Sequence, residues 1–260
     1  MNIHRFSLIV IFWGLSCVVA YAQGWPDIAL FFEGYKACFV LYDVKNDTVI
    51  RYNEKRCQER ISPCSTFKIP NSLIGLETGV IPDESHVFPW DGIERQIKSW
   101  NRDHDLRSAI ANSVVWYYQK LAVEVGERRM KEYLQKLNYG NMDISGGLTQ
   151  FWLGSSLKIS ANEQIDFLLK LYRNDLPFLQ QSIDIVKEIT ILSRTDDVIF
   201  RGKTGSGFEE GKRTWGWFVG YIERKENVFI FATHIEAKEN AFGIQAKEIT
   251  KNILKSLSLL

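Results

Sequence analysis

The segment from Ser65 to Gly79 constrains this chain more than any other part of it. Residues 66–78 have the apolar pattern of a helix, and Gly79 stands where helices commonly end. Pro70 is compatible with a helix only near the first turn, where its missing N–H costs little. The sequence therefore predicts a helix that begins beside Ser65 and carries Lys68 on the same face, three residues later.

A serine and a lysine on one helix face form a candidate nucleophile and base. A serine hydroxyl reacts poorly unless a neighbouring base removes its proton. Lysine ordinarily has a pKa of roughly 10.4, so Lys68 can act as that base only where burial or chemical modification removes its charge. The neighbours Phe67, Ile69 and Leu73 are apolar, which favours such a setting. Ser-x-x-Lys alone often arises by chance, so the assignment needs further support.

Residues 1–22 have the pattern of a secretory signal peptide. A short basic start precedes a nearly continuous apolar stretch at 6–20, and Ala20-Tyr21-Ala22 fits a small-x-small cleavage site. The apolar stretch is short for a membrane span of about 20 residues, so cleavage is favoured over a membrane anchor. The expected mature chain, 23–260, is one catalytic domain that is exported to the periplasm.

The cysteine pattern leaves pairing open. Cleavage of the signal removes Cys17, whose use in a lipid-anchored form is a lesser alternative, and leaves Cys38, Cys57 and Cys64. An exported protein meets an oxidising compartment, and Cys57 and Cys64 are near each other in sequence, so a disulfide between them is one expectation. An odd count leaves one thiol over, and three buried reduced thiols are the alternative.

Composition restricts the classes of partner. The 260 residues are 45% hydrophobic and 24% charged, which is enough for a substantial core. A net charge of +1 without a long basic block argues against nucleic acid and, after signal cleavage, against a membrane surface. The mixed charges of residues 209–213 are expected to form a solvated face. The four scattered histidines predict neither a metal site nor a Ser-His-Asp triad.

Strand and helix patterns alternate in blocks along the chain. We expect a first hairpin, a mostly helical middle from about 107 to 192, three further strands and a last helix. The expected strands are 36–42, 48–52, 200–203, 215–223 and 228–235, and the clearest expected helices are 66–78, 123–137, 162–172 and 242–259. This order predicts a mixed α/β fold with a mostly antiparallel central sheet, flanked by helices, and an inserted helical subdomain.

Three further motifs follow Ser65 and Lys68 in a fixed order. They are Ser113-Val114-Val115, Tyr139-Gly140-Asn141 and Lys203-Thr204-Gly205. Each alone admits a plain structural role, such as a helix cap for Ser113. Together, S-x-x-K and K-T-G are typical of serine penicillin-recognising enzymes, and with S-x-V and Y-G-N the chain resembles the class D β-lactamases, the oxacillinase family. The resemblance covers nearly the whole mature chain and includes Gly75-Leu76-Glu77-Thr78-Gly79, Trp90-Asp91-Gly92, Phe151-Trp152-Leu153 and Gly216-Trp217-Phe218-Val219-Gly220.

This resemblance implies hydrolysis of β-lactam antibiotics, and hence resistance, through an acyl-enzyme on Ser65. Lys68 would be carbamylated by carbon dioxide or bicarbonate to N6-carboxylysine and would be the general base, with no other cofactor and no metal. Ser113 would pass a proton to the departing β-lactam nitrogen, while Lys203 keeps the network electropositive. The implied carbamate pocket consists of Phe67, Val115, Trp152 and Leu153.

The resemblance also implies how a β-lactam is held. The substrate-binding residues would be Tyr139, Thr204, Gly205, Ser206 and Gly207. The N–H of Ser65 and that of Gly207 or Phe208 would form the oxyanion hole, and Tyr139-Gly140-Asn141 would shape the site floor. Many relatives bind the substrate carboxylate with an arginine near the start of the last helix, but residues 242–248 contain none. Lys247, Lys212, or Lys203 with a hydroxyl are the alternatives.

Two rival activities share the acylation step. A penicillin-binding peptidase would lack a fast deacylation base, and the apolar setting of Lys68 beside Trp152 favours the lactamase. A β-lactam sensor domain stays acylated and normally follows several membrane spans, whereas this chain shows one short signal. The sequence leaves open whether the protein is a monomer or a homodimer and which β-lactams it hydrolyses.

Overall fold

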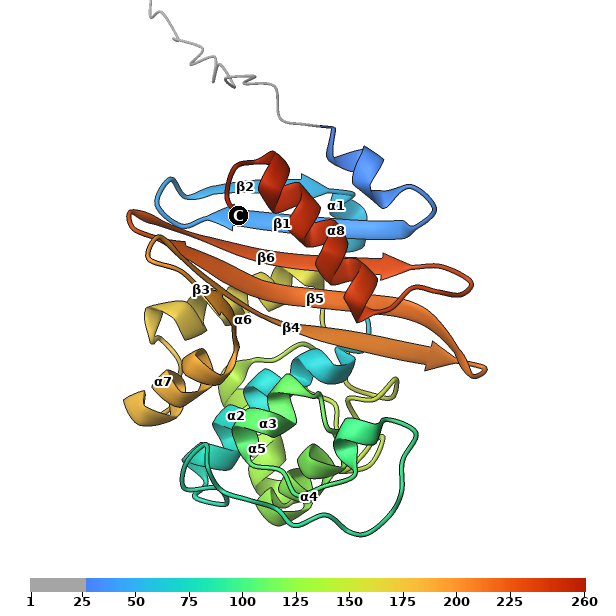
Figure 1. The fold of residues 1–260 in the computed structure, drawn as a ribbon, viewed down its shortest axis with the longest axis vertical. Coiled ribbons are helices and arrows are strands. Elements are labelled where there is room, and N and C mark those ends of the chain that lie inside the picture. The colour runs from blue at the N-terminus through green and yellow to red at the C-terminus, as the bar shows by residue number, and fades with distance from the viewer. Residues whose placement is uncertain (1–26) are drawn as a thin grey trace, which may run out of the picture.

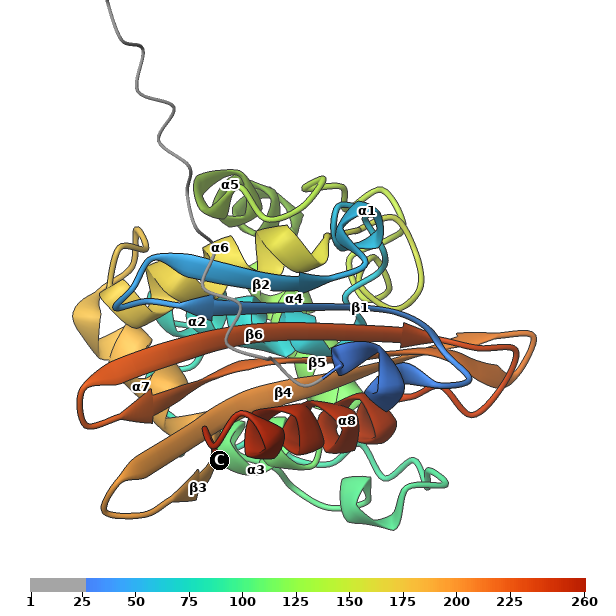
Figure 2. The same cartoon turned by 90° about the horizontal axis from the view of Figure 1, so that it is seen from above.

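A six-stranded antiparallel sheet runs through the protein, with helices on both faces. The computed structural model describes residues 27–260, so the predicted signal peptide at 1–22 lies outside the described residues. The strand order is β2-β1-β6-β5-β4-β3. Helix α8 crosses one face of this sheet, and the helices between β2 and β3 gather on the other (Figures 1 and 2). The predicted fold class and the inserted helical region are confirmed.

The described elements have these bounds. The strands are β1 (Lys36–Asp43), β2 (Thr48–Tyr52), β3 (Ile191–Arg194), β4 (Val198–Glu209), β5 (Lys212–Arg224) and β6 (Asn227–Glu236). The α-helices are α1 (Glu54–Cys57), α2 (Lys68–Glu77), α3 (Leu106–Ala111), α4 (Val115–Val125), α5 (Glu127–Leu137), α6 (Ala161–Arg173), α7 (Gln180–Ile189) and α8 (Gly243–Ser256). Short 3-10 helices are η1 (Ile28–Phe32), η2 (Cys64–Phe67) and η3 (Lys98–Trp100). Within residues 27–260, no helix is long and apolar enough to cross a membrane.

Strand β1 shows why the central strands are continuously apolar. Cys38 and Val40 pack into the core shared with the inserted helices, whereas Phe39 and Leu41 pack into a second core under α8 and η1. Successive side chains on a strand point to opposite faces, so a strand covered on both faces needs apolar residues at every position. The sheet is thereby fixed between two hydrophobic layers.

The structure departs from the predicted elements in two places. The helix predicted at 123–137 is divided at Gly126, whose φ of 81° ends α4 and precedes α5. Strand β3 begins at the end of the segment predicted to be helical and runs beyond it, because it is stabilised by pairing with residues 199–201 of β4 rather than by its own sequence pattern. The first hairpin and the last helix lie close to their predicted positions.

Candidate active site

Ser65 and Lys68 meet where η2 passes into α2. The Lys68 Nζ donates a hydrogen bond to the Ser65 Oγ at 2.8 Å. The Ser65 side chain is partly exposed, whereas that of Lys68 is fully buried. The spacing argument, which predicted that the amine reaches the hydroxyl, is confirmed. A nucleophile open to substrate and a base shielded from water result from one short stretch of chain.

Burial sets the charge preference of Lys68. Loss of hydration lowers the pKa of the Lys68 amine well below its ordinary value, and the positive charge of Lys203 lowers it further. The amine lies 5.2 Å from the centre of the Tyr118 ring, and it forms no ion pair with any carboxylate among residues 27–260. A neutral amine is therefore strongly favoured here, and a neutral amine is the form that can accept a proton or react with carbon dioxide.

A wall of aromatic rings encloses the helix start behind Lys68. Phe67 packs against Phe151 and Trp152, with ring centroids 5.1 and 5.6 Å apart. The Trp152 Nε1 is buried and has no hydrogen-bond partner within the described residues. A buried donor without a partner costs about 1–3 kcal/mol. Such a donor is suited to an acceptor that is not part of the unmodified chain.

Ser113 and Lys203 bring together two distant parts of the chain. The Lys203 Nζ on β4 donates to the Ser113 Oγ at 3.0 Å. Ser113 lies between α3 and α4 rather than inside a helix, and its φ of 55° is left-handed. Burial, with a smaller contribution from Lys247, lowers the pKa of Lys203 to about 7. This hydrogen-bonded pair therefore holds a proton that is easily released near neutral pH.

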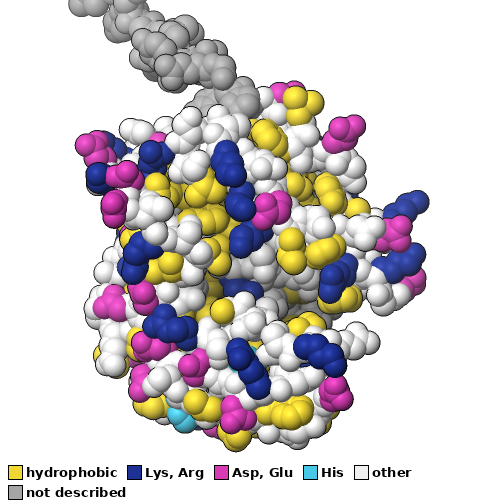
Figure 3. All heavy atoms as spheres, viewed as in Figure 1, with side chains coloured by type: hydrophobic (Ala, Val, Ile, Leu, Met, Phe, Trp, Pro, Cys, Tyr) yellow, Lys and Arg dark blue, Asp and Glu magenta, His cyan; other side chains and the backbone are white. Residues whose placement is uncertain are grey.

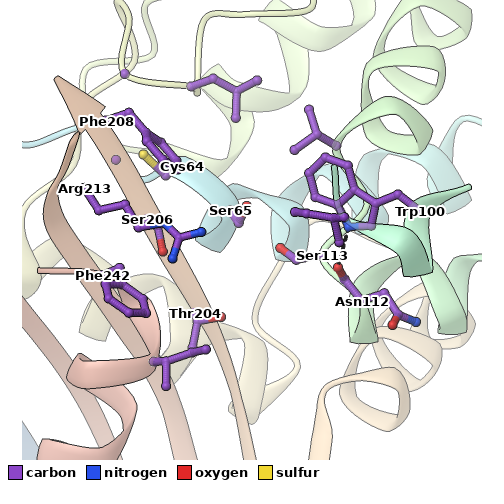
Figure 4. A pocket seen from close by; sticks show the side chains of 16 residues that line it. Cys64, Ser65, Trp100, Asn112, Ser113, Thr204, Ser206, Phe208, Arg213 and Phe242 are labelled. Atoms are coloured by element: carbon purple, nitrogen blue, oxygen red, sulfur yellow. Dashed lines mark hydrogen bonds between the residues drawn. The ribbon is translucent and has the colours of Figure 1, made fainter. Parts of the chain in front are cut away.

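These groups border a cavity of about 450 Å³ between the sheet and the inserted helices. Figure 4 shows Ser65 between Ser113 on one side and Thr204 and Ser206 on the other. In Figure 3 the face that contains this hollow carries basic and hydrophobic side chains around it. Of the predicted site residues, Ser65, Ser113, Val115, Leu153, Thr204, Ser206 and Gly207 line the cavity. Lys68, Lys203, Phe67 and Trp152 lie behind this lining and are buried, and Gly205, predicted to bind substrate, is also buried and does not line the cavity.

Two glycines let β4 pass close to Ser65. A Cβ on Gly205 would lie 2.7 Å from the Pro63 carbonyl oxygen and 3.3 Å from the Ser65 nitrogen. A Cβ on Gly207 would lie 1.8 Å from the Trp215 ring. Real Cβ atoms essentially never lie within 3.0 Å of such atoms, so a side chain at either position would force β4 or its neighbour to move. Strand β4 can therefore lie close to the nucleophile because these two positions have no side chain.

Ser62 ties the sheet to the loop that carries Trp152. The Ser62 carbonyl accepts a hydrogen bond from Trp217 Nε1 at 3.0 Å. The Ser62 hydroxyl donates to the Trp152 carbonyl at 3.0 Å and accepts from the Gly154 N–H at 2.9 Å. Because Ser62 precedes Ser65 by three residues, these bonds fix the approach to the nucleophile.

Two predictions about individual site residues need correction. Tyr139, predicted to bind substrate, is buried behind Phe67, with ring centroids 5.7 Å apart, and does not line the cavity. The disulfide suggested between Cys57 and Cys64 is absent, since both thiols are free. The Cys57 sulfur faces the carbonyls at the end of the first hairpin, whereas the Cys64 sulfur faces Ser62 beside the cavity.

Several lining residues were not predicted as site residues. They are Ile97, Trp100, Asn112, Gly154, Arg213, Phe242 and Ile244. Asn112 directly precedes Ser113, so its place followed from the motif. Ile97 directly precedes η3 and Trp100 ends it, and this segment has no motif of its own. Arg213 was assigned to a solvated cluster, and although it is exposed it also lines the cavity.

Comparison with known proteins decides between the serine enzyme families that use such a site. Residues 37–255 match the family model of the penicillin binding protein transpeptidase domain. A crystal structure of a class D β-lactamase from Bacillus subtilis is 44% identical, covers 90% of this chain and 96% of its own, and has a TM-score of 0.86. The chain belongs to the class D β-lactamases. The probable β-lactamase YbxI of Bacillus subtilis is 44% identical over 88% of this chain and 84% of its own.

One protein that is similar to this class D β-lactamase is named for a different role. The regulatory protein BlaR1 of Bacillus licheniformis is 38% identical over 88% of this chain, but the match covers only 38% of BlaR1. The similarity therefore concerns one region of that longer protein.

Proposed function

We propose that the protein hydrolyses β-lactam antibiotics, and thereby confers resistance, through an acyl-enzyme on Ser65. The observation that carries this proposal is the 2.8 Å contact between the Ser65 hydroxyl and an amine that is buried without a counter-ion among the described residues. A buried neutral amine activates the hydroxyl for attack on a carbonyl carbon. The adjoining cavity of about 450 Å³ is large enough for a small bicyclic amide.

Carbamylation of Lys68 fits the surroundings of its amine. The reaction with carbon dioxide requires the neutral amine, which the lowered pKa supplies. The unpartnered Trp152 Nε1 offers a donor in the same wall, and Phe67, Val115 and Leu153 provide apolar surroundings. When carbon dioxide is bound, the site gains an anionic base beside Ser65.

The residues of the chain divide the reaction between them. The Ser65 Oγ gives its proton to the base on Lys68 and bonds to the β-lactam carbonyl carbon, and the oxyanion so formed then collapses with cleavage of the C–N bond of the four-membered ring. Ser113, which accepts a hydrogen bond from Lys203, passes a proton to the leaving nitrogen. The N–H of Ser65 and that of Gly207 or Phe208 stabilise the oxyanion, each by roughly 3–4 kcal/mol. Water then cleaves the ester and restores the Ser65 hydroxyl.

The second candidate function is β-lactam sensing without turnover, and the similarity to a protein that is named as regulatory favours it. A sensor and a peptidase both acylate their serine but release the acyl group slowly. Turnover therefore separates the lactamase from both alternatives.

The experiment is steady-state hydrolysis of a penicillin panel and nitrocefin by the purified chain, with Ser65→Ala as the control. We expect many turnovers per molecule and none with the control. A stoichiometric burst without a steady state, with a stable adduct on Ser65 in the intact mass, would instead assign sensing or peptidase chemistry.

Export completes the proposal. Residues 1–22 would be a signal peptide removed before Gln23, which delivers residues 23–260 to the periplasm. N-terminal sequencing of protein from a periplasmic extract tests this directly. An N-terminus at Met1 on the accumulated protein would contradict it.

A further inference from the structure

We propose that Arg213 binds the carboxylate of the β-lactam, taking the place of the arginine missing from residues 242–248. This inference rests on the proposed β-lactam hydrolysis. Arg213 is the only charged residue among those that line the cavity beside Ser65 in the described part of the chain. It forms no ion pair with any acidic side chain of residues 27–260. Its guanidinium is therefore available for an anion brought by the substrate.

A β-bulge directs Arg213 to the cavity. Along β4 and β5, Ser206 pairs with Gly216 and Gly207 with Trp215, but after a register shift Phe208 pairs with Arg213. In unbroken register Phe208 would oppose Thr214, and Arg213 would share the face of Trp215. Because a shift of one residue exchanges the two faces of a strand, the bulge places Arg213 on the face of Phe208.

Two aromatic rings hold the guanidinium in place. The Arg213 Cζ lies 4.7 Å from the centre of the Phe242 ring and 5.5 Å from that of Phe208. The Arg213 carbonyl also accepts a hydrogen bond from the Ala241 N–H at 3.1 Å, which ties the start of β5 to the segment before α8. Stacking leaves the N–H groups at the edge of the planar guanidinium free for a carboxylate. The side chain is thereby oriented before substrate arrives.

Ser206 supplies a second donor at the same place. Figure 4 shows the Arg213 guanidinium beside the Ser206 side chain, between Phe208 and Phe242, with Ser65 farther into the cavity. The Ser206 Oγ accepts the Gly243 N–H at 2.9 Å, so its own hydrogen is free to be donated. A carboxylate at this point would receive hydrogen bonds from a guanidinium and a hydroxyl.

The lysines considered from the sequence lie elsewhere. Lys247 borders a different cavity, together with Gly202 and Lys203, and not the one beside Ser65. Lys212 borders a third cavity and lies 3.9 Å from the Glu239 carboxylate. Lys203 is buried, and its amine is engaged with Ser113 and the Thr204 carbonyl. Arg213 is therefore the cation best placed for the substrate.

The test compares benzylpenicillin with its methyl ester, which has the same ring system but no carboxylate charge. Acylation of Ser65 is followed by intact-protein mass spectrometry, so that slow turnover does not obscure the result, and hydrolysis is measured in parallel. The variants are Arg213→Ala and Arg213→Lys, with Lys212→Ala as the matched control on the adjacent residue. Thermal melting checks that the variants remain folded.

We expect Arg213→Ala to lower the acylation efficiency with benzylpenicillin about 10- to 100-fold, mainly through weaker binding. Each factor of ten corresponds to about 1.4 kcal/mol. Arg213→Lys should retain part of it, and Lys212→Ala all of it. The methyl ester should react equally with the wild type and Arg213→Ala. Equal losses for acid and ester, or no loss for the acid, would overturn the assignment while leaving hydrolysis by the wild type intact. If the wild type reacted with neither compound, the proposed function itself would fail.

Discussion

The Lys203 Nζ lies 3.0 Å from the Ser113 Oγ and connects strand β4 to the turn between α3 and α4. The serine reaches this position only in a left-handed backbone conformation, with φ at 55°. Such a conformation is costly for a residue other than glycine. The hydroxyl, rather than the backbone, accounts for serine at this position.

Two substitutions of Ser113 separate its chemistry from its conformation. Ser113→Ala and Ser113→Gly both remove the hydroxyl, so each should lower kcat for penicillin hydrolysis about 10²- to 10⁴-fold, the usual contribution of a proton-transferring group. Glycine adopts a positive φ without strain, so Ser113→Gly should unfold in urea at no lower a concentration than Ser113→Ala. Ser256→Ala on α8 is the control. Full activity in either Ser113 variant would contradict the proton relay.

Activity should depend on bicarbonate at mildly acidic pH. Burial holds the pKa of Lys68 well below its ordinary value, so the reactive neutral amine persists to lower pH than in a free lysine but is lost on further acidification. Initial rates should therefore fall below neutral pH, and added bicarbonate should restore them by mass action. With ¹³C-labelled bicarbonate, a carbamate resonance should appear in the wild type and be absent from Lys68→Ala. A rate at pH 6 that is indifferent to bicarbonate would argue against carbamylation.

The buried lysines should make stability rise with pH. The pKa of Lys203 is about 7 in the folded protein and roughly 10.4 in an unfolded chain. Between these values the unfolded state binds more protons, so the free energy of unfolding increases from pH 7 to about pH 10. Lys203→Met should reduce this slope in urea titrations at pH 7, 8 and 9. A smaller increase of the free energy of unfolding with pH should remain, because Lys68 is also buried. An unchanged slope in Lys203→Met would show that this amine keeps its charge when folded.

Trp152→Phe should trap the acyl-enzyme. The substitution keeps an aromatic ring against Phe67 but removes the unpartnered Nε1 donor. The carbamate proposed on Lys68 would then lack this donor, so deacylation should slow more than acylation. Intact-protein mass spectrometry after mixing with penicillin should show a persistent adduct that the wild type lacks, and Trp90→Phe is the control. Normal turnover by Trp152→Phe would remove the role proposed for this indole.

Gly207→Ala should be strongly destabilising because the Trp215 ring occupies the space that a side chain would need. The new Cβ would lie 1.8 Å from Trp215, a contact that requires either the ring or β4 to move. Trp215→Ala removes the obstacle, so the double variant should lose less stability than the two single losses combined. A double-mutant cycle in urea measures this coupling, for which contacting residues give about 0.5–3 kcal/mol. Strict additivity would mean that β4 shifts rather than Trp215.

The sequence predicted best what local spacing determines. Ser65 and Lys68 are three residues apart on one helical turn, and their contact follows from that distance alone. The hairpin at 36–52 followed from two apolar runs around a turn. Family resemblance, rather than periodicity, brought in Ser113 and Lys203, which lie far apart in the chain.

What the sequence did not predict depends on tertiary contacts. The bulge that directs Arg213 to the cavity exists only in the pairing of β4 with β5. Tyr139 lies behind Phe67 because two helices and a loop converge there, which a three-residue motif cannot indicate. The sulfur of Cys57 faces the first hairpin although Cys64 is near in sequence.

The two hydrogen-bonded pairs of the site differ in how they assemble during folding. Ser65 in η2 and Lys68 at the start of α2 are separated by three positions, so their contact forms together with a single helical turn. The other pair spans 90 positions and forms only after the inserted helices have docked onto the sheet. Loop closure over such a span is slow and entropically costly. Recovery of enzyme activity after dilution from denaturant should therefore lag behind the return of the helical circular dichroism signal. The lag reports the docking of the inserted helices onto the sheet.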